Sequence, residues 1–259
     1  MIDDEHAIEL RTFGRRKGRK ASPRQAALKD TVLPRVALDL SAPYTVLLPS
    51  GRRCPEGADE GALARAAPAR PPSTMASPPH GEKELPVWLE IGFGGAEHLI
   101  WQAKHNPDAL LIGCEPFEDG VMKALDAIQS GAIENIRIHM GDARDVLRWL
   151  PEASIARAFV LFPDPWPKRK HQKRRLVNSQ TLALLARVLK PGAELRFGTD
   201  IGDYARSALE AFQHEPRFKW LANTPADWRV RPADWPETRY EAKAEREGRR
   251  RYYFRFERV

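Results

Sequence analysis

The sequence predicts an α/β fold in which a mostly parallel, seven-stranded sheet has helices on both faces. Short runs rich in β-branched and aromatic residues alternate with longer helix-type patterns from Leu85 onward, which is typical of parallel strands joined by crossover helices. The length of 259 residues suits one such domain with appendages. The last two strands are expected to pair antiparallel.

Each predicted element is a short window of the sequence. Strands are predicted at residues 87–91, 109–114, 136–140, 158–162, 194–198, 218–221 and 252–256. Helices are predicted between the first five strands, at residues 96–104, 117–130, 143–150 and 179–189.

The N-terminal third has a different organisation. Ser22 and Gln25 form a capping-box pattern with Pro23 at the first helical position, which predicts a short helix. Residues 50–84 are rich in Pro, Ala and Gly without apolar periodicity, which predicts a flexible insertion. The expected organisation is a basic arm and helix at 1–49, this insertion at 50–84, and the main domain at 85–259.

Charge and cysteine content limit the classes of function. The net charge of +7 favours an anionic partner, and the cations gather at residues 15–20, 168–175 and 246–251. Two isolated cysteines do not support a disulfide framework or a thiolate zinc site, and no metal is expected. With no apolar run of membrane-spanning length and no signal-peptide pattern, we expect a cytoplasmic protein without a membrane partner.

Polar residues at three predicted strand ends indicate a nucleoside-binding site. Gly92 and Gly94 follow the first strand, where glycines allow a ligand to approach the backbone. Glu97 occupies the last position of the dinucleotide-binding glycine pattern, which argues against a pyrophosphate there. Glu115 after the second strand can accept hydrogen bonds from ribose hydroxyls, and Asp142 after the third can accept from an adenine amino group. These spacings predict bound adenosine without phosphates.

A second motif, at residues 162–175, follows the fourth strand. Asp164 lies between two prolines, Trp166 follows, and a dense run of Lys and Arg comes next. An acid and an indole can hold a flat heteroaromatic ring, and the cations can bind a phosphodiester backbone. This motif therefore predicts chemistry on a nucleobase.

Taken together, the motifs resemble class I methyltransferases that use S-adenosylmethionine and, more narrowly, the bacterial tRNA (guanine-N7)-methyltransferase family. The similarity extends over residues 10–40 and from Leu85 to the C-terminus. Its carrying features are Glu90 to Gly94, Glu115, Asp142, Phe162 to Lys168, Lys173 to Arg175, Thr199, Asp200, Thr238 to Glu241 and Phe256 to Arg258. Ala96 departs from the family, because many members have glycine there.

The resemblance implies a Rossmann-like class I methyltransferase fold in residues 85–259 and a role for each matching residue. Asp164 matches the active-site position. Methyl-donor binding is implied for Glu90, Gly92, Gly94, Glu115, Asp142 and Asp164. Substrate binding is implied for Lys168, Asp200, Thr238, Arg239, Tyr240 and Glu241. RNA contact is implied for Lys170, His171, Gln172, Lys173, Arg174 and Arg175. The implied reaction is methylation of N7 of a guanine in the tRNA variable loop.

Several alternatives stay open at this level. An amino-group methyltransferase acting on nucleic acid has a similar acidic loop, although Trp166 here follows Pro165 where that loop has a second proline. A noncatalytic RNA-binding module would have no need for the Glu115, Asp142 and Asp164 combination. Asp142 and Asp200 each precede a helix and could be N-caps. Residues 238–241 are expected in a loop that closes over the site, and no obligate protein partner is expected.

Overall fold

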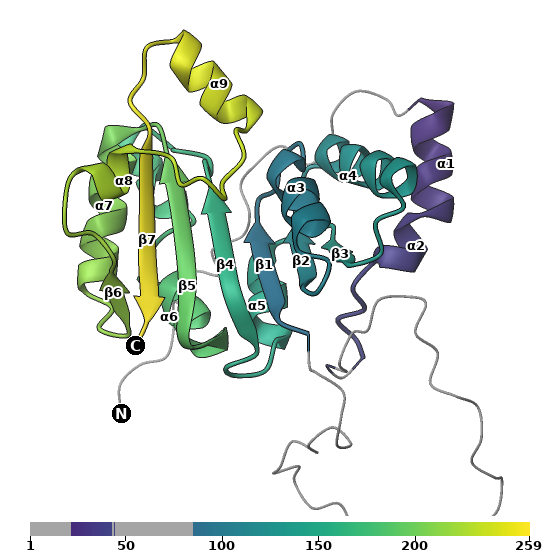
Figure 1. Ribbon diagram of the computed structural model, residues 1–259, viewed down its shortest axis with the longest axis horizontal. Coiled ribbons are helices and arrows are strands. Elements are labelled where there is room, and N and C mark those ends of the chain that lie inside the picture. The colour runs from purple at the N-terminus through teal and green to yellow at the C-terminus, as the bar shows by residue number, and fades with distance from the viewer. Residues whose placement is uncertain (1–21, 43, 45–84) are drawn as a thin grey trace, which may run out of the picture.

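A computed structural model describes residues 22–42, 44 and 85–259, and it contains the expected seven-stranded sheet (Figure 1). The strand order is β3-β2-β1-β4-β5-β7-β6. Strands β1 to β5 pair in parallel, whereas β7 is antiparallel to both β5 and β6. The predicted fold class and the antiparallel pairing of the last two strands are confirmed.

The strands lie close to the predicted windows. They are β1 (Val87–Ile91), β2 (Leu110–Cys114), β3 (Ile136–His139), β4 (Ile155–Leu161), β5 (Leu189–Thr199), β6 (Phe218–Trp220) and β7 (Tyr252–Arg258). The largest difference is β5, which begins five residues before the predicted start at residue 194 because Leu189 already pairs with Ile155. A register shift near this pairing breaks the apolar pattern from which the strand was predicted.

Helices cover both faces of the sheet. The helices are α1 (Pro23–Thr31), α2 (Leu33–Val36), α3 (Glu97–His105), α4 (Glu118–Gly131), α5 (Ala143–Trp149), α6 (Ser179–Val188), α7 (Gly202–Gln213), α8 (Ala226–Arg229) and α9 (Arg239–Arg246), with a 3-10 helix η1 at Arg169–Arg174. One apolar cluster packs α5, α6 and α7 on one face, and another packs α1, α3 and α4 on the other. This two-sided burial is why the central strands are almost continuously apolar.

The predicted N-terminal helix is present as α1. The Ser22 hydroxyl accepts from the Gln25 amide, and the Gln25 side chain accepts from the Ser22 amide, so the capping box is complete. The helix is held on α4 by an ion pair between Lys29 and Glu118 at 2.8 Å and by buried apolar residues such as Leu28. The first basic cluster at 15–20 and the insertion at 50–84 lie outside the described residues.

Among the described residues, the helices are too short or too polar to cross a lipid bilayer. The longest, α4, has 14 residues, whereas a membrane-spanning helix needs about 20.

Candidate active site

A cavity of about 460 Å³ opens at the carboxyl ends of the central strands. It lies where the strand order reverses between β1 and β4, which is the usual ligand position in open α/β sheets. Residues from the ends of β1 to β4 line it together with the first turn of α9. The polar lining residues include Glu115, Asp142, Arg144, Asp164, Arg174, Arg239 and Tyr240.

One side of the cavity is the glycine turn, residues 92–95, between β1 and α3. Gly92 and Gly94 have φ angles of 74° and 54°, which favour glycine. Ala96 also has a left-handed backbone, with φ 66°, at the N-cap of α3. The substitution of alanine at this position therefore keeps the left-handed geometry, at a cost on the order of 1–2 kcal/mol.

Glu115 braces this turn from the end of β2. Its Oε2 accepts from the Gly94 amide at 2.8 Å, and its Oε1 accepts from the Phe117 amide at 2.9 Å. Burial raises the pKa of Glu115 despite these two hydrogen bonds. Each carboxylate oxygen has two acceptor sites, so backbone bonding leaves acceptor capacity directed at the cavity.

Asp142 and Glu90 have different surroundings. Asp142 caps α5, because its Oδ1 accepts from the Arg144 amide, and its carboxylate is also held by the Arg144 guanidinium at 2.9 and 2.6 Å. The capping alternative is thus realised at a residue that also lines the cavity. Glu90 is buried beneath the glycine turn and is not a lining residue, since its Oε2 contacts Nδ1 of buried His98 at 2.8 Å.

Asp164 lies on a loop with an unusual backbone. Phe162 and Trp166 flank it with φ angles of 50° and 42°. Non-glycine residues in this region are strained, and such strain clusters at functional sites. Asp164 keeps an exposed surface, and partial desolvation by the surrounding loop raises the pKa of its carboxyl group. The loop is tied down by Arg175, whose Nε donates to the Pro165 carbonyl at 2.9 Å.

The segment at 238–241 forms the opposite rim, and it is helical. Thr238 is the N-cap of α9, with Glu241 completing a capping box; the expectation of a loop is therefore wrong. Buried Glu241 also accepts from the Tyr253 hydroxyl at 2.9 Å. Arg239 and Tyr240 line the cavity, and a Cβ atom on Gly94 would lie only 2.9 Å from the Tyr240 ring. The first turn of α9 therefore closes against the glycine turn.

Comparison with known proteins gives a consistent result. A family model described as a putative methyltransferase matches residues 84–254. A tRNA (guanine-N(7)-)-methyltransferase of Ruegeria sp. (strain TM1040) is 45% identical over 95% of this chain and 87% of that protein. One from Zymomonas mobilis is 41% identical over 96% and 94%, respectively. This chain belongs to the tRNA (guanine-N(7)-)-methyltransferase family.

The fold of this family member has parallels among solved structures. The 16S rRNA methyltransferase KamB aligns with a TM-score of 0.51 and 17% identity, over 67% of this chain and 88% of that one. At this level of identity the match supports the Rossmann-like methyltransferase fold alone.

The cavity fits S-adenosylmethionine, the donor expected for this family. Its volume falls in the range of small-molecule sites. Open space lies where Gly92 would carry a Cβ atom, so a ligand can approach the backbone there. Glu115 and Asp164 line the cavity, and these acids favour a cationic nucleoside over a pyrophosphate.

The residues expected to bind the RNA substrate separate into several environments. Lys168, Lys170 and Lys173 are exposed around η1. Arg174 lines the cavity and its guanidinium lies 5.0 Å from the centre of the Trp166 ring, while the His171 ring lies 6.0 Å from that of Trp166. Gln172 donates to Asp203 at 3.0 Å.

Arg175 does not fit its expected role in RNA contact. Its side chain is 3% exposed and donates to Pro165, Ser207 and Asp203. Because four of its five N–H groups are used inside the protein and the side chain is buried, Arg175 anchors the Asp164 loop and presents no cation to a partner. Asp200 is not an N-cap either, since it accepts from Arg249 at 2.7 Å and α7 is preceded by Ile201.

Two charged residues of the cavity, Arg144 and Lys123, were not anticipated from the sequence. Arg144 lines the cavity and holds Asp142, and Lys123 lines it from α4. Glu97 pairs with Arg239 across the glycine turn. No sequence motif marked Arg144 or Lys123. The start of α9 did have a readable signal, since a threonine followed three residues later by a glutamate predicts a helix start.

Proposed function

We propose that this chain transfers a methyl group from S-adenosylmethionine to N7 of a guanine in the variable loop of tRNA. The carrying observation is that a single cavity joins Glu115 and Asp142 to Asp164. A site for the methyl donor and a site for a flat base therefore share one space, as direct transfer between them requires. Family membership supports tRNA as the partner and guanine as the base.

The carboxylates of the cavity indicate how the methyl donor would be held. Bound S-adenosylmethionine would supply an electrophilic methyl group on a sulfonium cation. Glu115 would accept hydrogen bonds from ribose hydroxyls, and Asp142 would accept from the adenine amino group. Glu90, buried beneath the turn, would act through the field of its carboxyl group and through the position of His98.

Around the guanine, the reaction requires positioning of the ring more than proton transfer. Guanine N7 has an in-plane lone pair, so no general base is needed to expose it. Holding two reactants in line can recover about 7–11 kcal/mol of a barrier in favourable systems. Asp164, held between two prolines, would accept hydrogen bonds from N1 and N2 of guanine and offset the positive charge that develops on the ring.

Residues around Asp164 would make the remaining contacts with the RNA. Trp166 lines the cavity beside Asp164 and would stack on the base, which is worth roughly 1–3 kcal/mol. Lys168 would contact the base edge or a nearby phosphate. Exposed Lys170 and Lys173 would bind the phosphate backbone, which fixes register without choosing the nucleotide. With tRNA as the substrate, we expect the protein to act in the cytoplasm, where bacterial tRNA is found.

A single assay tests this function. Unmodified tRNA is incubated with the chain and labelled S-adenosylmethionine, digested to nucleosides, and the labelled product is identified. We expect 7-methylguanosine, and loss of label when the variable-loop guanine of the transcript is replaced by adenine. Methyladenosine or methylcytidine as the product would instead assign the chain to the amino-group methyltransferases, and absence of label would contradict the proposal.

A further inference from the structure

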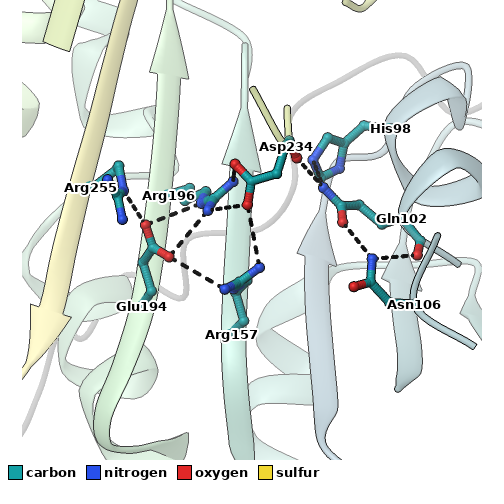
Figure 2. Close-up of polar contacts among 8 residues, drawn as sticks. All are labelled: His98, Gln102, Asn106, Arg157, Glu194, Arg196, Asp234 and Arg255. Atoms are coloured by element: carbon teal, nitrogen blue, oxygen red, sulfur yellow. Dashed lines mark hydrogen bonds and ion pairs between the residues drawn. The ribbon is translucent and has the colours of Figure 1, made fainter. Parts of the chain in front are cut away.

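A polar network links the segment before α9 to the sheet and to α3, and Asp234 lies at its centre (Figure 2). The Asp234 carboxylate accepts two hydrogen bonds from Arg196 of β5, at 2.9 and 2.7 Å. Arg157 of β4 lies 3.8 Å away. A paired guanidinium fork of this kind fixes the direction of the carboxylate as well as its distance.

The backbone of Asp234 is held from the other side by α3. Its carbonyl accepts from Nε2 of Gln102 at 2.8 Å, and the same amide group lies 3.1 Å from Nε2 of His98. The Gln102 Oε1 accepts from Asn106 at 3.1 Å. Because the Gln102 amide group has only two hydrogens, it donates one to Asp234 and one to His98.

This pattern also defines the hydrogen bond beneath the glycine turn. With Nε2 of His98 acting as an acceptor, the ring proton lies on Nδ1 and is donated to Glu90 at 2.8 Å. Gln102, His98 and Glu90 are all at most 3% exposed. Gln102 therefore orders a buried acid under the glycine turn and, with its other hydrogen, the segment that leads to α9.

The segment runs directly from Asp234 to the rim of the cavity. Trp235 follows and is 1% exposed, and its indole packs against Tyr253 with ring centres 5.2 Å apart. Three residues later Thr238 caps α9, whose next residues, Arg239 and Tyr240, lie against the glycine turn. Asp234 therefore lies four residues before the N-cap of the helix that presents these two side chains.

We propose that Asp234 and Gln102 are positioning residues that hold the first turn of α9 on the glycine turn and so set the affinity for the methyl donor. The inference rests on the proposed function, because it takes S-adenosylmethionine as the ligand of this cavity. Neither residue lines the cavity. Both act through the residues that do.

The network allows the positioning role to be separated from a role in folding. The Asp234 side chain is 51% exposed, so its removal leaves no cavity in the core. Arg196 then keeps the Glu194 carboxylate, which it contacts at 3.2 and 3.3 Å. A buried guanidinium that retains one acid partner avoids the cost of an unpaired charge. The Asp234→Ala variant should therefore fold.

The test is calorimetric titration of the full chain with S-adenosylmethionine in the absence of tRNA, together with thermal unfolding. For Asp234→Ala, which removes the two bonds from Arg196, and for the near-isosteric Gln102→Met, which removes the bond to the Asp234 carbonyl, we expect the dissociation constant to rise about tenfold because the first turn of α9 is no longer held on the glycine turn. Arg255→Gln is the matched control, because Arg255 contacts Glu194 in the same cluster but not the segment. Its dissociation constant should not change.

A double-mutant cycle identifies the route of the effect. In a chain that already carries Arg239→Ala and Tyr240→Ala, adding Asp234→Ala should change the dissociation constant by no more than about twofold. Equal tenfold effects in both backgrounds, or an unchanged constant in Asp234→Ala, would overturn the positioning role. If the unsubstituted chain itself fails to bind S-adenosylmethionine, the proposed function falls first.

Discussion

The two sides of the cavity are built in different ways. The donor wall, formed by the glycine turn, Glu115 and Asp142, is fixed by contacts between residues at most 21 positions apart in sequence. Glu115 bonds to amides 2 and 21 residues away, and Asp142 bonds to Arg144. The closing wall, formed by residues 162–167 and the first turn of α9, depends on distant contacts. Arg239 reaches Glu97 across 142 residues, and Gln102 reaches Asp234 across 132.

This difference determines how substitutions in each wall should affect folding and catalysis. Glu115 and the glycine turn follow the paired strands β2 and β1, so the donor wall is complete once the sheet is assembled. The closing wall needs β4, α3 and α9 to meet, and it stores strain at Phe162 and Trp166. Substitutions in the closing wall should therefore change catalysis and ligand affinity more than they change folding.

The largest effect is expected at Asp164. Asp164→Ala should lower the rate of methyl transfer at least about 100-fold, because it removes the acid that we propose orients the guanine and offsets its charge. Binding of tRNA, measured by filter retention, should change little, since the phosphate contacts that we propose lie at Lys170 and Lys173. Asp145→Asn is the control, because Asp145 is an exposed acid on the nearby helix α5 and does not line the cavity.

Equal turnover by Asp164→Ala and the unsubstituted chain would remove Asp164 from the mechanism. A parallel loss of tRNA binding and turnover would instead place it among the residues that hold the RNA, and the closing wall would then be a binding surface alone.

The same contrast explains how much could be predicted from sequence. Strand ends followed by glycine or a lone acid are local patterns. The sheet could therefore be predicted from the sequence, and the ligand site at its edge could be assigned to Gly92, Gly94, Glu115 and Asp142, which line the cavity. The burial of Arg175 could not be predicted, because its partner Asp203 lies 28 residues further along the chain. A basic run predicts exposed cations, and only tertiary packing shows which member turns inward.

The second prediction concerns the donor wall. In Glu115→Gln the amide group can accept at only one oxygen, so either the Gly94 or the Phe117 amide loses its partner. We expect binding of S-adenosylmethionine to weaken at least about tenfold. Calorimetric titration measures this change. An unchanged dissociation constant would mean that the wall is held by the backbone alone.

The raised pKa of Glu115 adds a pH dependence with a defined sign. In the proposed donor site Glu115 accepts hydrogen bonds as an ionised carboxylate, so donor affinity should fall as the pH drops through the raised pKa, above the ordinary value of about 4.3. Folding has the opposite trend. Since the folded chain binds this proton more tightly, the free energy of unfolding falls as pH rises from the ordinary to the raised value. Glu115→Gln should reduce both dependences.

The third prediction separates the exposed cations from the buried one. Lys170→Gln with Lys173→Gln should weaken tRNA binding several-fold and lower its salt dependence by roughly 0.7–0.9 per lost phosphate contact. Arg175→Gln should instead lower the free energy of unfolding by about 1–3 kcal/mol, because it breaks contacts with Pro165 and Ser207. Affinity measured across a salt series and chemical denaturation distinguish the two. An unchanged salt slope in the lysine variant would place η1 away from the RNA.

The smallest effect compares two capping boxes of the same type. Ser22 caps α1 far from the cavity, and Thr238 caps α9 at its rim. Replacement of either by alanine should cost about 1 kcal/mol of stability. Only Thr238→Ala should also raise the dissociation constant for S-adenosylmethionine, by about twofold, because fraying of the first turn of α9 loosens Arg239 and Tyr240. If both variants bind the donor as the unsubstituted chain does, the position of α9 is set by Asp234 and Trp235 and not by its own cap.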